Sequence, residues 1–162
     1  MQEVELHSAI SSAFREVEYP GKARLVAHQC EECSELDEAF RDKDPATMLP
    51  STVERHWGDL PLLTPESFHY FLPAYLRCAI NEPTSLVAEF LLYSLIPGKS
   101  EEFFRARFDL FSGAQRDVVY RVIEVIEAAD VDRDFCNAYG VAKSCWEATE
   151  PATVMNSVKP AR

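Results

Sequence analysis

Apolar residues recur at spacings of three and four along most of this chain, which is the period of an amphipathic helix. The first stripe predicts a helix over residues 3–17 and consists of Leu6, Ile10, Ala13, Phe14 and Val17. The same period predicts further helical segments over residues 31–42, 65–80, 84–95, 100–108, 112–126 and 132–146. The pattern is therefore that of a helical protein.

Two of these segments begin with clear capping signals. Thr64 suits an N-cap and Pro65 suits the first helical position, where a missing N–H leaves no hydrogen bond unmade. Ser112 and Gln115 have the spacing of a capping box. Pro73 lies inside the helix that starts at Pro65, and we expect it to kink that helix, because proline cannot donate to the carbonyl one turn back.

Two segments lack the helical period. Residues 22–29 are interpreted either as a short strand or as a linker. Residues 45–63 are rich in proline and predict a long ordered loop that is anchored by Trp57. A loop of this length usually has a function of its own or contains a short helix. The whole pattern predicts an all-α, irregular bundle of six or seven helices with at most a minor hairpin. One domain is expected over residues 1–149, followed by a disordered tail over 150–162.

The chain is strongly acidic. Its 162 residues include 27 Asp and Glu against 16 Lys and Arg, which gives a formal charge of −11. This charge repels phosphate backbones and anionic lipids and attracts basic surfaces, so we expect a protein partner and neither nucleic acid nor membrane. Solubility alone also explains an acidic surface. The first residues lack a secretory signal and the five cysteines lack a disulfide spacing, so a cytoplasmic location is expected.

Residue types that bind metals gather between positions 28 and 33. Zinc prefers four soft or borderline ligands in a tetrahedron, and Cys30 and Cys33 would supply two of them. His28 would be a third ligand and His56 a fourth, although the chain has no second close ligand pair. A redox dithiol is the other use of this spacing, which the two intervening glutamates disfavour. The simplest interpretation makes Cys33 a core residue, so no cofactor is expected and zinc remains an alternative.

The helix predicted over residues 31–42 carries carboxylates on the side opposite its apolar stripe: Glu31, Glu35, Glu38 and Asp42. Like charges at this spacing destabilise a lone helix by a few tenths of a kcal/mol each. Such a cost is consistent with a face that binds a basic partner and equally with a face that is only solvated. These four residues are the candidate partner-binding site.

The sequence carries no pattern typical of an enzyme. His56 and His69 each lie close to polar or aromatic residues, but the sequence places no serine or cysteine nucleophile beside either. Only five glycines occur, and none forms a phosphate-binding loop. A protein without catalytic activity is therefore the better interpretation.

Three segments together resemble a family of small bacterial proteins to which no activity is assigned. These segments are a C-x-E-C element at Cys30 to Cys33, a tryptophan loop at Trp57-Gly58-Asp59, and the run LTPESFHYFLPAYL from Leu63 to Leu76. The resemblance extends over about residues 28–128. It implies a compact helical domain in which the cysteines, the tryptophan and Pro73 belong to one structural unit, and it implies no activity.

Three hypotheses follow for the function. The leading one is a non-enzymatic interaction protein, of the immunity, antitoxin-like or regulatory kind, which binds a basic partner through its acidic helical surface. The second is a metal- or thiol-dependent protein that uses His28, Cys30 and Cys33. The third is a nucleic-acid mimic that uses its charge of −11 to occupy a basic groove.

Overall fold

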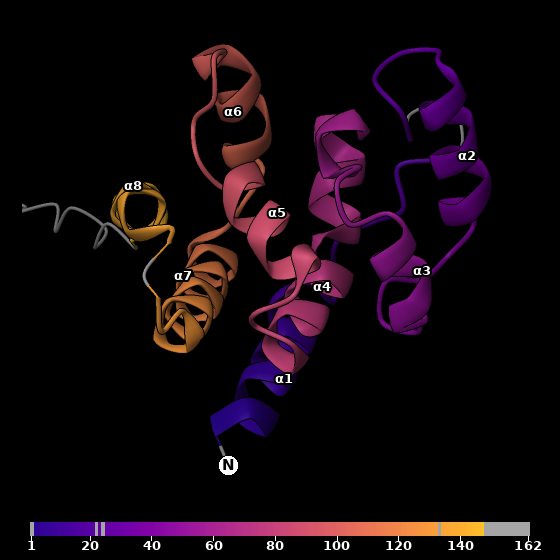
Figure 1. Ribbon diagram of the computed structural model, residues 1–162. Helices are drawn as coiled ribbons and strands as arrows, with labels where there is room; N and C mark the ends of the chain where they lie inside the picture. Colours follow the sequence, from indigo (N-terminus) through magenta and orange to yellow (C-terminus); the bar gives the residue numbers. More distant parts are fainter. Residues whose placement is uncertain (1, 22, 24, 133, 148–162) are drawn as a thin grey trace, which may run out of the picture.

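The helical periods of the sequence form eight α-helices and one 3₁₀ helix in the computed structural model, which describes residues 2–147 except 22, 24 and 133 (Figure 1). The elements are α1 (Gln2–Ala13), α2 (Glu31–Phe40), α3 (Pro50–Arg55), η2 (Leu60–Leu62), α4 (Pro65–Asn81), α5 (Leu86–Ser94), α6 (Glu101–Phe108), α7 (Gly113–Ala129) and α8 (Cys136–Trp146). The all-α class is confirmed. The predicted tail, residues 150–162, lies outside the described residues.

Helix α4 is the centre of the structure. Most of its circumference is buried, and it contacts α1, α3, α5, α6 and α7. A stripe with Glu66, Tyr70, Arg77 and Asn81 is exposed or only partly buried. Helices α2 and α3 lie on one side of it and α7 and α8 on the other (Figure 1). Its start is as predicted, because the Thr64 side chain accepts a hydrogen bond from the Ser67 N–H and Pro65 follows. Pro73 lies buried in the middle of the helix.

The structure differs from the sequence prediction in two places. The predicted loop over 45–63 contains α3 and η2, which raises the number of α-helices to eight. Helix α1 ends at Ala13 instead of residue 17, and Val17 then closes a tighter turn by donating to the Phe14 carbonyl at 3.1 Å. In the described segments, residues 22–29 contribute one isolated antiparallel bridge, between Val26 and Leu63, which agrees with the prediction of at most a minor hairpin.

The C-terminal helix is held by an aromatic junction. The Trp146 indole N–H of α8 donates to the Leu95 carbonyl at 2.6 Å. The Trp146 ring lies 5.0 Å from the rings of both Phe108 and Phe111. Because a buried tryptophan has both a large apolar surface and a donor to satisfy, this junction fixes α8 against α5 and α7.

A nearby network joins α1, α4 and α7. The Gln115 side-chain oxygen accepts from the Ser112 N–H and from His69 Nε2–H, each at 2.9 Å, and its amide donates to the Ala13 carbonyl at 3.0 Å. The His69 ring is half-buried between Phe14 and Phe111, and this burial lowers its pKa. The capping box predicted at Ser112 therefore also positions a neutral histidine.

We predict that this histidine makes stability depend on pH. Because the pKa of His69 is lowered in the folded state, the unfolded chain takes up the proton at a higher pH, near the ordinary value of 6.5. The contribution of His69 to the free energy of unfolding is therefore complete above pH 6.5 and is lost as pH falls through the folded pKa. Urea denaturation between pH 8 and pH 5 should show a smaller loss for His69→Gln than for the wild type. At pH 8, where His69 is neutral in both states, the comparison measures only the structural effect of the substitution. An equal loss on acidification in both proteins would contradict this prediction.

The buried Arg107 of α6 holds η2 in place. Its Nη2 donates to the carbonyls of Leu60, Pro61 and Leu63 at 3.5, 2.9 and 3.4 Å. The guanidinium carbon lies 4.5 and 4.0 Å from the ring centroids of Phe68 and Phe103. No carboxylate in the described part of the chain forms an ion pair with it, and burial lowers its pKa to about 10. Carbonyl groups and aromatic faces thus replace a counter-ion.

Arg107→Met is expected to lower the free energy of unfolding by about 2 kcal/mol, since it leaves buried carbonyl groups without a donor. Arg105 of the same helix is exposed, so Arg105→Met is the matched control and should change stability by less than about 0.5 kcal/mol. Urea denaturation of the two variants measures the difference. Equal stabilities would show that the carbonyl contacts of Arg107 do not hold η2.

Candidate functional site

The start of α2 brings a histidine and two thiols together. Cys30 is the N-cap, and its Sγ accepts a hydrogen bond from the Cys33 N–H at 3.1 Å. The chain before α2 is held to the start of α4, because the Ala27 N–H donates to the Leu62 carbonyl at 2.8 Å and the Thr64 N–H donates to the Leu25 carbonyl at 3.1 Å. This pairing returns the chain to α2 with His28 beside the helix start.

The cluster consists of His28, Cys30 and Cys33, whose ligand atoms all lie within 4.8 Å of one another. The Cys33 Sγ is 3.3 Å from the His28 Nδ1. Cys33 is buried, Cys30 is half-buried and His28 is exposed, so the cluster has an inner side in the core and an outer side that faces solvent. Three of the four residues proposed from the sequence as metal ligands are therefore neighbours.

His56, the fourth proposed ligand, is not part of this cluster. Its ring is buried, its Nδ1 lies 2.7 Å from the Asp59 Oδ2, and it packs edge-on against Phe40. Its carbonyl accepts a hydrogen bond from the Tyr75 hydroxyl at 2.8 Å. His56 caps the end of α3 and anchors the tryptophan loop to α4, which is a structural role.

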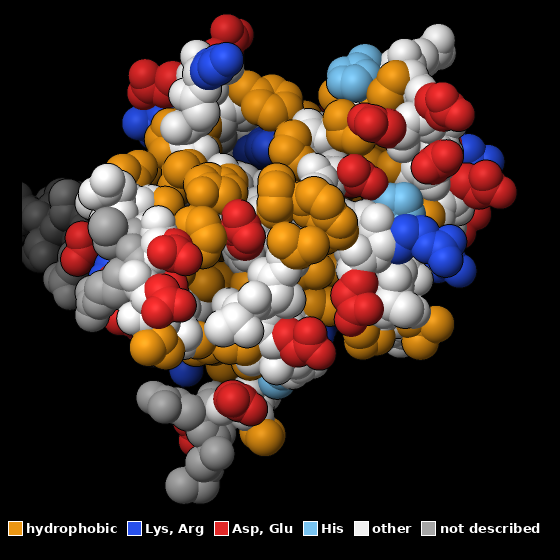
Figure 2. Space-filling model, in the orientation of Figure 1, with side chains coloured by type: hydrophobic (Ala, Val, Ile, Leu, Met, Phe, Trp, Pro, Cys, Tyr) orange, Lys and Arg blue, Asp and Glu red, His pale blue; other side chains and the backbone are white. Residues whose placement is uncertain are grey.

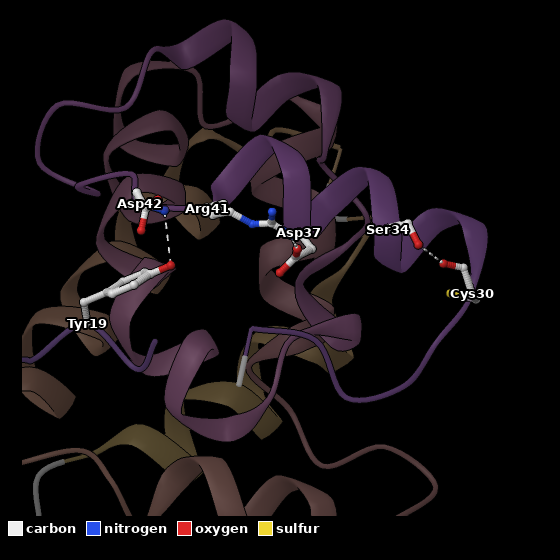
Figure 3. A network of polar contacts seen from close by, with 6 residues as sticks. All are labelled: Tyr19, Cys30, Ser34, Asp37, Arg41 and Asp42. Carbon is white, nitrogen blue, oxygen red and sulfur yellow. Dashed lines mark hydrogen bonds and ion pairs between the residues drawn. The ribbon is translucent and has the colours of Figure 1, made fainter. Parts of the chain in front are cut away.

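The four carboxylates proposed for partner binding are all exposed along α2 and its end. Glu31, Glu35 and Glu38 form no ion pair within the described residues. The network in Figure 3 follows this helix: Asp37 pairs with Arg41, and the Asp42 N–H donates to the Tyr19 hydroxyl at 3.1 Å. Arg41 thus neutralises the charge of Asp37 near the end of α2. Glu31 and Glu35, near the beginning of the helix, have no ion-pair partner among the described residues.

The structure also contains a row of aromatic rings that the sequence analysis missed. The Trp57 ring lies 4.3 Å from Phe90, Phe90 lies 6.1 Å from Tyr93, and Tyr93 lies 5.9 Å from Phe135. Tyr93 is 45% exposed. We call these four residues the aromatic row. Figure 2 shows this face of the molecule, on which hydrophobic side chains gather over α5 and Asp and Glu side chains lie around them.

A hollow of about 390 Å³ lies at the α8 end of the aromatic row. We call it the acidic hollow, because its lining includes the carboxylates of Glu89, Asp130, Asp132 and Asp134. Its apolar walls include Phe135 and Leu92, and no Lys or Arg of the described chain lines it. The buried Tyr139 also lines the hollow. Burial and the neighbouring Asp130 raise the pKa of Tyr139, which keeps its hydroxyl protonated.

The family model for a family of unknown function (DUF6714) matches residues 2–150. The chain belongs to this family. No curated protein and no solved structure matches the chain. Membership in DUF6714 confirms the resemblance drawn from the C-x-E-C element, the tryptophan loop and the helix from Pro65, and it assigns no activity to either site described above.

None of the helices in the described segments is long and apolar enough to cross a membrane. The missed aromatic row had one signal in the sequence: Phe90 and Tyr93 are spaced by three and lie off the stripe formed by Leu91 and Leu92. Helix α5 therefore has apolar residues on two sides, of which it buries Leu91 and Leu92 and leaves Tyr93 exposed.

We predict that the two thiols of the cluster react at very different rates in the metal-free protein. Burial and the neighbouring Cys30 thiol raise the pKa of Cys33 to about 11, so only about one Cys33 in a thousand is a thiolate at pH 8. Iodoacetamide labelling followed by peptide mapping should show Cys30 modified well before Cys33. Labelling in guanidinium, where both thiols are exposed, is the control. Equal rates in the folded protein would show that Cys33 is not protected.

Proposed function

We propose that this protein is a non-enzymatic interaction module that binds a basic, partly apolar segment of another protein. The observation that carries the proposal is the junction of the aromatic row with the acidic hollow. The segment would lay apolar side chains on Trp57, Phe90 and Tyr93 and insert a Lys or Arg side chain into the hollow.

The composition of this face fits such a partner. Aromatic residues are enriched in the buried centres of protein interfaces and supply most of their binding energy, with polar residues at the rim. Phe135 lines the hollow and meets Tyr93 edge-on at 90°, so a ring face there can contact a cation. Glu89 and Asp134 line the same hollow and offer carboxylate oxygens to the cationic group.

The carboxylates of α2 serve a second purpose in this proposal. Glu31, Glu35 and Glu38 are exposed, and their charges act over roughly 8–10 Å at physiological ionic strength. Charges at a rim mainly raise the association rate of an oppositely charged partner, whereas affinity resides in the buried contacts. We therefore assign steering to α2 and anchoring to the aromatic row and the acidic hollow.

Site-specific photo-cross-linking in the native cell tests this assignment. A photoreactive phenylalanine analogue replaces Tyr93 in one variant and Val141 of α8 in the control, because the two side chains are 45% and 47% exposed. We expect the analogue at position 93 to cross-link a basic segment of one protein and the analogue at position 141 to leave that protein free. No product specific to position 93, or a cross-linked segment without Lys or Arg, would contradict the proposal.

The purified partner then allows the anchoring contacts to be measured. Tyr93→Ala and Glu89→Lys should each weaken binding by at least about tenfold, which corresponds to 1.4 kcal/mol. Glu35→Gln on α2 should slow association and change dissociation little. Isothermal titration gives the affinities and stopped-flow mixing at several salt concentrations gives the rates. An unchanged affinity for both anchoring variants would place the interface elsewhere.

A further inference from the structure

We propose that His28, Cys30 and Cys33 form a binding site for one Zn²⁺ ion, a function separate from the proposed interaction face. His28 precedes α2, Cys30 is its N-cap and Cys33 lies in its first turn, and the three ligand atoms lie within 4.8 Å of one another. Two thiolates and an imidazole are the ligand types that zinc prefers in proteins.

The distances fit a tetrahedral ion with little rearrangement. With Zn–S bonds of about 2.3 Å and a Zn–N bond of about 2.0 Å, two sulfurs of a tetrahedron lie about 3.8 Å apart, and a sulfur and a nitrogen lie about 3.5 Å apart. The observed Cys33 Sγ to His28 Nδ1 distance is 3.3 Å, and the widest pair of the three atoms is within 4.8 Å. The widest pair therefore has to close by at most about 1.3 Å to reach the tetrahedral separation.

The charges of the proposed site also balance. Zinc would displace one proton from each thiol to solvent, and the two thiolates would neutralise the divalent ion. His28 would bind through Nδ1 and keep its proton on Nε2. Because His28 is exposed and Cys30 is half-buried, the fourth position of the tetrahedron faces solvent, where a water molecule completes the coordination.

Zinc at this position would tie α2 to the rest of the domain. The segment that carries His28 is fixed to the start of α4 through the Val26–Leu63 bridge and the hydrogen bond from the Ala27 N–H to the Leu62 carbonyl. Cys33 belongs to the buried stripe of α2. An ion shared by His28 and Cys33 would therefore link the two, and a metal that binds only the folded state raises its stability.

Zinc titration of the reduced, chelator-treated full chain against a chromophoric chelator tests the site directly. We expect one ion per chain, and Co²⁺ in its place should give thiolate-to-metal absorption. His28→Ala and Cys30→Ser should each weaken zinc binding by more than roughly 100-fold. The matched controls are His7→Ala and Cys145→Ser, which replace the same residue types outside the cluster and should bind zinc as the wild type does.

Thermal unfolding with and without zinc gives a second measurement. Zinc should raise the Tm of the wild type and of both controls and leave those of His28→Ala and Cys30→Ser unchanged. Both test residues lie on the outer side of the cluster, so their replacement leaves the packing of Cys33 intact. Zinc should also protect Cys30 from iodoacetamide until a chelator is added. The inference is overturned if the wild type binds zinc no more tightly than Cys30→Ser, or if the controls lose zinc to the same extent.

Discussion

Helix α4 is unstable in water as a single helix, because apolar side chains cover most of its circumference. Every such residue requires cover from another element, and five α-helices supply it. Full burial of one large apolar side chain contributes roughly 1.5–3 kcal/mol, so the fully buried Phe68, Phe71 and Leu72 alone outweigh any single polar contact in the structure. The requirement to cover α4 determines where the remaining helices lie, and both candidate sites are consequences of that placement.

Two of the elements beside α4 keep one side exposed or partly exposed to solvent. Helix α5 packs Leu91 and Leu92 inward, and this leaves Phe90 and Tyr93 on the opposite surface, where they extend the row from Trp57 toward α8. Helix α2 buries a narrow stripe that includes Cys33 and exposes its carboxylates. The exposed sides of α5 and α2 contribute less to the core than the inward sides, and they are free to carry binding chemistry.

Local signals were sufficient to predict the ends of the helices that carry strong caps. Thr64 with Pro65, and Ser112 with Gln115, act within one turn, so the sequence alone locates them. A short helix was left open for the loop over 45–63, but α3 could not be located because its N-cap residue, Leu49, has no side-chain acceptor and its six residues are too few to show a period. The end of α1 was misplaced because Phe14 and Val17 continue the apolar stripe through a turn, so the pattern persists after the helical backbone has ended.

The candidate sites show the same division between local and long-range information. His28, Cys30 and Cys33 are close in sequence, so spacing indicated their cluster. His56 was wrongly grouped with them because spacing cannot show that Asp59 and Phe40 already hold its ring. The aromatic row joins residues far apart in the chain, from Trp57 to Phe135, and no local pattern contains that contact.

The partners of the four histidines distinguish scaffold from site. Three of the rings have a polar partner elsewhere in the fold. His7 bonds to Asn81, His56 to Asp59 and His69 to Gln115. His28 is the exposed member of the set, and its neighbour at 3.3 Å is a thiol, which is a weak hydrogen-bond partner and a strong zinc ligand once deprotonated. A histidine and two cysteines are a poor structural substitute for an amide or carboxylate contact, whereas the proposed ion would make this combination stabilising.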